Sequence, residues 1–81
     1  METKVIFRVW KAEPKTVLAL FPDLLEEGYT CLCYEMNNFK LFPEIYKEVL
    51  PLTRPALPHE YAELEQELKN IGYNLKIRKK R

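Results

Sequence analysis

The segment from Thr53 to Arg81, TRPALPHEYAELEQELKNIGYNLKIRKKR, constrains the fold more than any other part of the chain. Pro58 suits the first position of a helix, and Gly72 suits the position that follows a helix end. Beyond the glycine, apolar and polar residues alternate, as in a strand with one face in solvent. The apolar positions are Tyr73, Leu75 and Ile77, and the polar ones are Asn74, Lys76 and Arg78. The segment predicts a helix from Pro58 to about Asn70 and then a final strand at a sheet edge.

The predicted helix has one apolar stripe and one polar face. The stripe consists of Tyr61, Leu64, Leu68 and Ile71, and the residues expected in water are Glu63, Gln66, Glu67 and Asn70. Leu57 precedes the helix as a poor N-cap, because its side chain has no oxygen to accept a backbone N–H. Glu65 and Lys69 stand four residues apart in the favourable order for an ion pair.

Three strands are predicted in the first half of the chain. Lys4–Lys11 has one apolar and one mixed face, whereas Thr16–Phe21 is apolar on both sides, which is typical of a more central strand. Tyr29–Met36 is rich in aromatic and other strand-forming residues. Because the links between these strands are short, we expect an antiparallel meander.

The middle of the chain predicts a second, shorter helix. Pro43 suits a first helical turn, and apolar residues recur at helical spacing from there to Leu50. Thr53–Leu57 is expected to be an extended linker, since proline disfavours helix in the residue before it. We therefore predict a single small α+β domain over residues 1–81, ordered βββααβ, with helices on one face of a mainly antiparallel four-stranded sheet.

Charge is distributed unevenly along the chain. The net charge is +1, yet the residues before Lys76 contain eight basic and twelve acidic side chains. An acidic body is not expected of a domain whose whole face binds nucleic acid. The basic end, residues 76–81, either protects an edge strand from pairing with other chains, which we favour, or contacts phosphate. Its basic residues are Lys76, Arg78, Lys79, Lys80 and Arg81.

Signals for export or membrane insertion are not visible in the sequence. The early apolar run Val17–Phe21 is interrupted by Pro22, and no run approaches the roughly 20 apolar residues of a membrane span. We expect a cytoplasmic protein that makes no membrane contact.

The candidate chemical groups favour structural roles. His59 is the single histidine, and no nucleophile or metal ligand stands at a recognisable spacing from it. Cys31 and Cys33 lack the usual C-x₂₋₄-C spacing of a zinc pair, and we expect them on the core face of a strand with no disulfide between them. The glutamates of the main helix alternate with its apolar stripe, as in any solvated helix. We therefore predict no catalytic residue, metal or cofactor.

Aromatic residues exceed what one helix layer covers in so small a domain. We infer an exposed hydrophobic patch that meets a protein partner or a second copy of the chain. The residues assigned to it are Trp10, Phe39, Phe42 and Tyr46.

Four short motifs resemble those of a group of short uncharacterised bacterial proteins found in mobile elements and prophages. The matching segments are ALFP at Ala19–Pro22, CLCY at Cys31–Tyr34, PHEY at Pro58–Tyr61 and IGYNL at Ile71–Leu75. The group usually carries a glycine-glutamine-histidine segment after the third strand, and the corresponding stretch Met36–Leu50 contains no glycine or histidine. The resemblance implies a compact cytoplasmic domain of mobile-element origin and supplies no activity.

These observations favour a non-catalytic protein-binding module that acts through the aromatic patch. The resemblance implies one version of it, a modulator or inhibitor of a host nucleic-acid or defence enzyme. The alternative is a nucleic-acid-binding accessory protein that uses the basic end, and an enzyme is the least favoured class.

Overall fold

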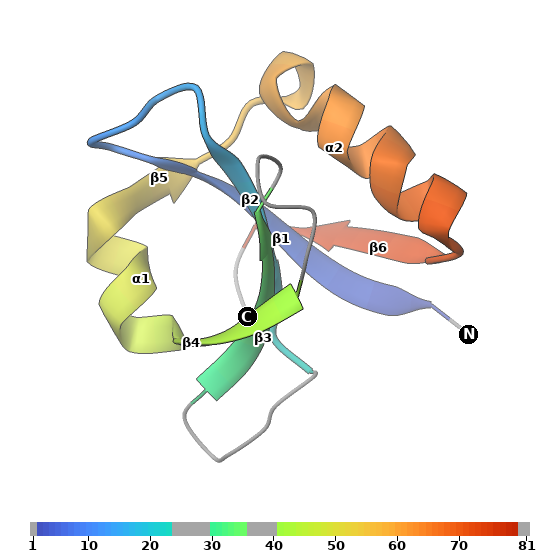
Figure 1. Ribbon diagram of the computed structural model, residues 1–81, viewed down its shortest axis with the longest axis horizontal. Coiled ribbons are helices and arrows are strands. Elements are labelled where there is room, and N and C mark those ends of the chain that lie inside the picture. Colours follow the sequence, from blue (N-terminus) through green and yellow to red (C-terminus); the bar gives the residue numbers. More distant parts are fainter. Residues whose placement is uncertain (1, 24–29, 36–40, 80–81) are drawn as a thin grey trace.

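The computed structural model describes residues 2–23, 30–35 and 41–79, with only the backbone described for residues 30, 31 and 41–44. It is a small α+β domain, which confirms the predicted class and the general order of elements (Figure 1). The strands are β1 (Thr3–Trp10), β2 (Val17–Phe21), β3 (Thr30–Glu35), β4 (Leu41–Ile45), β5 (Thr53–Pro55) and β6 (Leu75–Arg78). The helices are α1 (Tyr46–Leu52) and α2 (Pro58–Ile71).

The sheet is built outward from β1 and β2. Strands β1 to β3 form the predicted antiparallel meander, with β2 in the middle, and β4 continues it as a fourth antiparallel strand. On its other edge β1 pairs with two strands, β5 in antiparallel and β6 in parallel orientation. The sheet is therefore mainly antiparallel, and the described residues form six of its strands, where the sequence predicted four.

The two additional strands come from segments that were assigned to a helix and a linker. The short helix was predicted from Pro43, yet Pro43 lies in β4 and α1 begins at Tyr46. Proline is acceptable there because β4 pairs only with β3 among the described residues, so it is an edge strand that can lack a ladder donor. The first part of the expected linker, Thr53–Pro55, is extended as predicted and pairs with β1.

The two helices cover opposite faces of the sheet, which corrects the prediction that both lie on one face (Figure 1). Leu64 and Leu68 of α2 pack on one core cluster, which also contains Val5, Phe7, Val9, Val17, Ala19, Phe21 and Tyr34. Tyr46 and Val49 of α1 pack on the other, with Ile6, Leu18, Leu20 and Cys33. The reason is β2, whose residues are all buried: apolar side chains on both sides of a strand require a cover on both sides.

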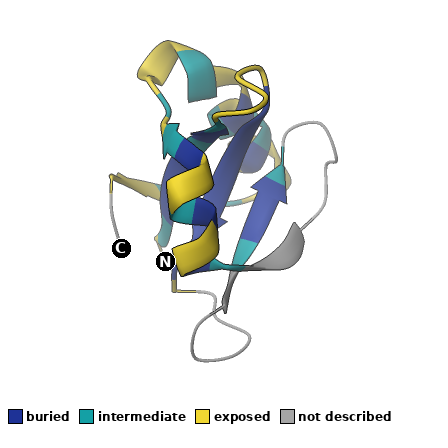
Figure 2. Ribbon diagram, turned by 90° about the vertical axis from the view of Figure 1, so that its left-hand side faces the viewer, coloured by how far each residue is buried: buried dark blue, intermediate teal, exposed yellow. Residues whose placement is uncertain are grey.

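Figure 2 shows the buried residues concentrated in the central strands. Helix α2 ends as predicted at Gly72, which has a φ of 125° and donates its N–H to Leu68 and Lys69 carbonyls. Its buried stripe is shorter than predicted, because Leu64 and Leu68 are fully buried whereas Ile71 is 56% exposed. A helix across a small sheet is covered best at its middle turns, and Ile71 belongs to the last turn.

The difference in burial between Leu64 and Ile71 predicts different effects on stability. Leu64→Ala should lower the free energy of unfolding by about 2–5 kcal/mol, because it removes buried methyl groups and leaves a cavity. Ile71→Ala, on the exposed end of the same helix, should change it by about 0.5 kcal/mol or less. Urea unfolding followed by circular dichroism checks both values. Equal losses at the two positions would contradict this assignment of the core.

Candidate functional site

The second edge of β1 changes partner at Phe7. Before it, Thr3–Ile6 pair with β6, and after it, Arg8–Trp10 pair with β5. At Phe7 itself the carbonyl oxygen accepts a hydrogen bond from the Ala56 N–H at 3.1 Å, where the chain leaves β5 for α2. We call this place, where β5 and β6 diverge, the seam.

A pocket of about 320 Å³ opens at the seam. This seam pocket is lined by Phe7, Pro55, Ala56, Leu57, Pro58, Tyr61, Ile77, Arg78 and Lys79. Most of these side chains are apolar, and Leu57 and Ile77 are 53% and 40% exposed. The pocket therefore presents apolar surface to solvent, beside two cationic residues.

Stacked aromatic rings fix one wall of the seam pocket. The ring centroids of Phe7 and Tyr61 lie 4.4 Å apart, and the ring planes differ by 8°. Phe7 is buried in the core, whereas Tyr61 is half-buried. Because aromatic stacking and core packing both hold Phe7, this wall is set before any ligand arrives.

An ion pair holds the start of α2, which forms another wall. The Glu60 carboxylate accepts hydrogen bonds from Arg54 at 2.8 and 2.6 Å and from the Leu57 backbone N–H at 2.8 Å. These contacts compensate for the missing side-chain cap at Leu57. The bond from Arg54 and then that from Leu57 lower the pKa of Glu60 to about 2.

Arg8 anchors β5, which leads into the pocket. Its guanidinium donates to the Thr53 hydroxyl at 3.0 Å and to the carbonyls of Thr53 and Leu50 at 2.9 and 3.2 Å. The Thr53 hydroxyl in turn donates to the Val49 carbonyl at 3.0 Å. Arg8 thus satisfies carbonyls at the end of α1, which has no basic residue in its own last turn. Burial lowers the pKa of Arg8 below its ordinary value.

Three exposed cationic residues lie in β6 or directly after it: Lys76, Arg78 and Lys79. We call them the cationic row. Arg78 and Lys79 also line the seam pocket. The ion pairs found in the described part of the chain join Lys4 to Asp23, Arg54 to Glu60 and Lys69 to Glu65, so none of them involves the row. Lys80 and Arg81, predicted to belong to the same basic end, lie outside the described residues.

Of the residues assigned to the aromatic patch, the structure describes the side chains of Trp10 and Tyr46. Tyr46 is only 4% exposed, because it packs with Val49 on the apolar residues of β1 and β2. Trp10 is half-buried against the same cluster and lines a small pocket with Ala12, Glu13 and Glu35. Phe39 and the side chain of Phe42 lie outside what the structure describes. Tyr46 therefore belongs to the core, which corrects its assignment to an exposed surface.

Sequence reasoning missed Leu57 and Ile77 as site residues. For Leu57 the sequence did contain an indication. Leucine is an unfavourable N-cap, so its presence at that position suggests a role other than capping the helix. The alternation Tyr73, Leu75 and Ile77 predicted one apolar face, but not that the face ends in an open pocket. That pocket depends on the meeting of three distant segments.

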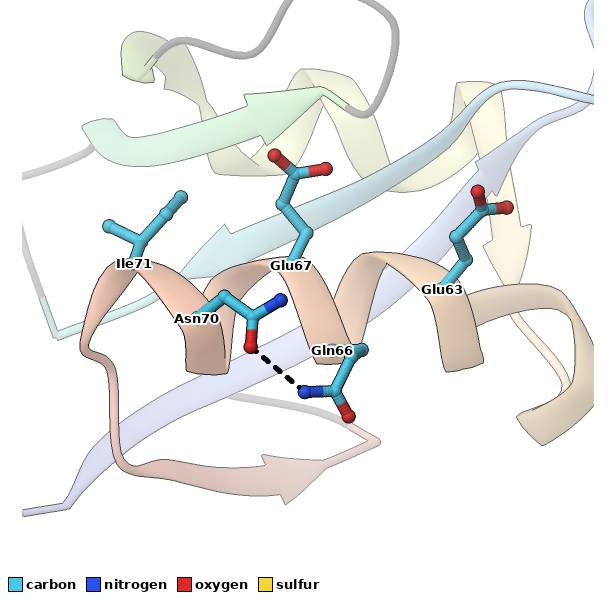
Figure 3. Close-up of a pocket in the computed structure, with 5 residues that line it drawn as sticks. All are labelled: Glu63, Gln66, Glu67, Asn70 and Ile71. Atoms are coloured by element: carbon cyan, nitrogen blue, oxygen red, sulfur yellow. Dashed lines mark hydrogen bonds between the residues drawn. The ribbon is translucent and has the colours of Figure 1, made fainter.

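A second pocket, of about 400 Å³, lies against α2 (Figure 3). It is lined by Glu63, Gln66, Glu67, Asn70 and Ile71, and Gln66 donates a 3.0 Å hydrogen bond to Asn70. Burial, and next the Glu67 carboxylate, raise the pKa of the Tyr34 phenol beneath the helix. The two carboxylates of this second pocket do not belong to a metal-binding cluster, because the described residues contain no group of three or more His, Cys, Asp or Glu side chains that could hold a metal ion.

His59 is an exposed helix residue, and Cys33 is a buried core residue. His59 is exposed in the first turn of α2, beside Glu60. Cys33 is fully buried in the core, as predicted, and packs in the cluster that α1 covers; the side chain of Cys31 is not described. The seam pocket, as far as its described lining shows, contains no carboxylate, imidazole or thiol.

Comparison with known proteins found no matching family model, no matching curated protein and no matching solved structure. In the described part of the chain, neither helix is long and apolar enough to cross a membrane.

The contacts of Glu60 predict a dependence of stability on pH. The folded pKa of about 2 lies below the ordinary value of 4.5, so the contribution is complete above about pH 4.5 and is lost as the pH falls through about 2. Glu60→Gln should therefore lower the unfolding free energy most at neutral pH and least near pH 2. Urea titrations of wild type and variant across this range measure the difference.

Glu63→Gln is the matched control, because it removes the same charge from an exposed position of α2. It should leave the start of the helix intact. A Glu60→Gln effect that is as large near pH 2 as at neutral pH would show that the ionised contacts do not stabilise this wall.

Proposed function

We propose that this protein is a non-catalytic protein-binding module that acts through the seam pocket. The observation that carries the proposal is the exposure of Leu57 and Ile77 around an apolar pocket of about 320 Å³ with a fixed aromatic wall. Apolar surface that is gathered around a pocket and bordered by polar residues is typical of protein-binding sites. We place the contact surface at the seam pocket because Tyr46, one of the four residues of the expected aromatic patch, is buried.

The chemistry of the lining supports binding. Aromatic residues and arginine are enriched at the centres of protein interfaces, where a side chain of the partner fills a pocket. The seam pocket combines Phe7 and Tyr61 with Arg78. Its volume is at the lower end of the range of ligand pockets, which suits one or two anchoring side chains of a larger partner.

The resemblance to mobile-element proteins extends the proposal to the kind of partner. In this version the module binds, and thereby modulates, a host nucleic-acid or defence enzyme. The seam pocket supplies the contact surface, and the cationic row beside it favours a partner surface with negative charge.

A photoreactive amino acid in place of Leu57 tests the proposal in cells of the native host. Irradiation should give a discrete covalent adduct with another protein, because position 57 lies at the pocket mouth. The same amino acid in place of Ile71, which is 56% exposed but outside the seam pocket, is the control. Denaturing electrophoresis and mass spectrometry identify the adduct. Equal or absent adducts at the two positions would overturn the proposal.

Nucleic-acid binding is the second candidate function. The cationic row favours it, since these side chains make no ion pair within the described residues. The acidic excess before Lys76 opposes it, because it repels a long polyanion.

Fluorescence anisotropy with a labelled oligonucleotide tests the second candidate. If phosphate contacts carry the function, binding should weaken steeply with salt and disappear in the double variant Lys76→Glu, Arg78→Glu. The charge-matched control is Lys47→Glu, at an exposed position of α1. If the affinity does not change with salt concentration, or is the same in the double variant as in wild type, nucleic-acid binding through the cationic row is excluded.

A further inference from the structure

Within the described residues, no strand pairs with the outer edge of β6. Its inner edge pairs with β1. Its register places Thr3 beside Leu75, and the Thr3 N–H donates to the Asn74 carbonyl at 2.6 Å. In a parallel ladder the N–H and C=O of one residue point to the same side, and successive residues alternate. The backbone groups of Leu75 and Ile77 therefore face away from β1.

The side chains of these two residues lie on the face that α2 covers. Leu75 packs against the core cluster beneath α2, and Ile77 lines the seam pocket. A strand added beside β6 has alternate side chains on that same face. One of them thus comes next to Ile77, at the mouth of the pocket.

The cationic row selects what can pair with this edge. Like charges placed opposite each other on neighbouring strands are destabilising, so a second copy of β6 is disfavoured. A strand with glutamate or aspartate at the corresponding positions is favoured for the same reason. The row therefore protects the edge from self-pairing and leaves it open to an acidic strand.

The geometry points to one occupant of this edge: an extended acidic peptide segment of a protein partner. The segment pairs with β6 as an additional strand, places one apolar side chain in the seam pocket and sets its carboxylates against Lys76 and Arg78, with Lys79 just beyond the end of the strand. This inference rests on the proposed protein-binding function and names the chemistry of the partner. It belongs to the known mode of recognition by strand addition.

A peptide fits these observations better than a nucleic acid does. The pocket is mainly apolar, with Phe7, Leu57 and Ile77 in its lining, and phosphate groups gain nothing from it. Two residues of the cationic row, Lys76 and Arg78, lie within β6, which matches the few carboxylates that a short strand presents on one face.

A synthetic peptide provides the probe. It is roughly six residues long, the length of an ordinary strand, and alternates glutamate with leucine. Titrated into isotope-labelled wild-type protein, it should shift the backbone amide signals of Leu75 and Ile77 and the methyl signals of Leu57 and Ile77, with saturation. The same peptide with alternate backbone nitrogens methylated should bind about tenfold more weakly, because it cannot complete the ladder.

Variants of the protein separate the contribution of the cationic row to peptide binding from that of the seam pocket. The double variant Lys76→Glu, Arg78→Glu should bind the acidic peptide about tenfold more weakly, whereas Lys47→Glu should bind it like wild type. Ile77→Ala should weaken binding about fivefold, and Ile71→Ala should not. Each variant's amide spectrum reports whether it is folded, and the methylated peptide tests the wild type without any substitution.

Several outcomes would overturn the inference. They are saturable shifts confined to another face, equal binding of a peptide that alternates lysine with leucine, equal binding of the methylated peptide, and binding of an oligonucleotide in place of the peptide. If position 57 captures a partner in cells while the acidic peptide fails to bind at β6, the protein-binding function stands and the strand-addition inference falls. If both experiments fail, both proposals fall.

Discussion

The structure depends on the pairing of β1 along both of its edges. One edge is given to β2, and the other is divided between β5 and β6, which approach from opposite directions. Because β5 and β6 cannot both continue past Phe7, the chain must turn outward there, and α2 begins in that turn. The core beneath α2, the aromatic stack on Phe7 and the seam pocket all follow from this division of one edge.

Much of the fold could be predicted from local patterns. Three local patterns indicated elements that the structure contains. They are the apolar residues on both sides of β2, the glycine after α2 and the alternation of apolar and polar residues in β6. The arrangement of the helices was predicted wrongly. A strand that is apolar on both sides, as β2 is, needs a helix on each face of the sheet, whereas the prediction placed both helices on one face. The start of the short helix was predicted wrongly at Pro43 for a different reason. Proline is compatible with a first helical turn and with an edge strand, and only the pairing with β3 shows that Pro43 lies in a strand.

The candidate site was the least predictable part. The surplus of aromatic residues predicted an exposed patch that included Tyr46, whereas Tyr46 is buried where α1 packs on the sheet. The surface that is open combines Phe7, the start of α2 and the end of β6. Residues so far apart share no sequence pattern, so only the topology reveals that they meet.

The parallel pairing of β6 with β1 has a consequence for motion. It closes the longest loop of the described chain, and a short edge strand held by such a closure is among the first elements to detach by local opening. When β6 detaches, Ile77 and Arg78 leave the pocket together and the inner amides of Thr3 and Val5 lose their partners. A ligand that bridges β6 and α2 therefore slows hydrogen exchange in β1, a strand that it never touches.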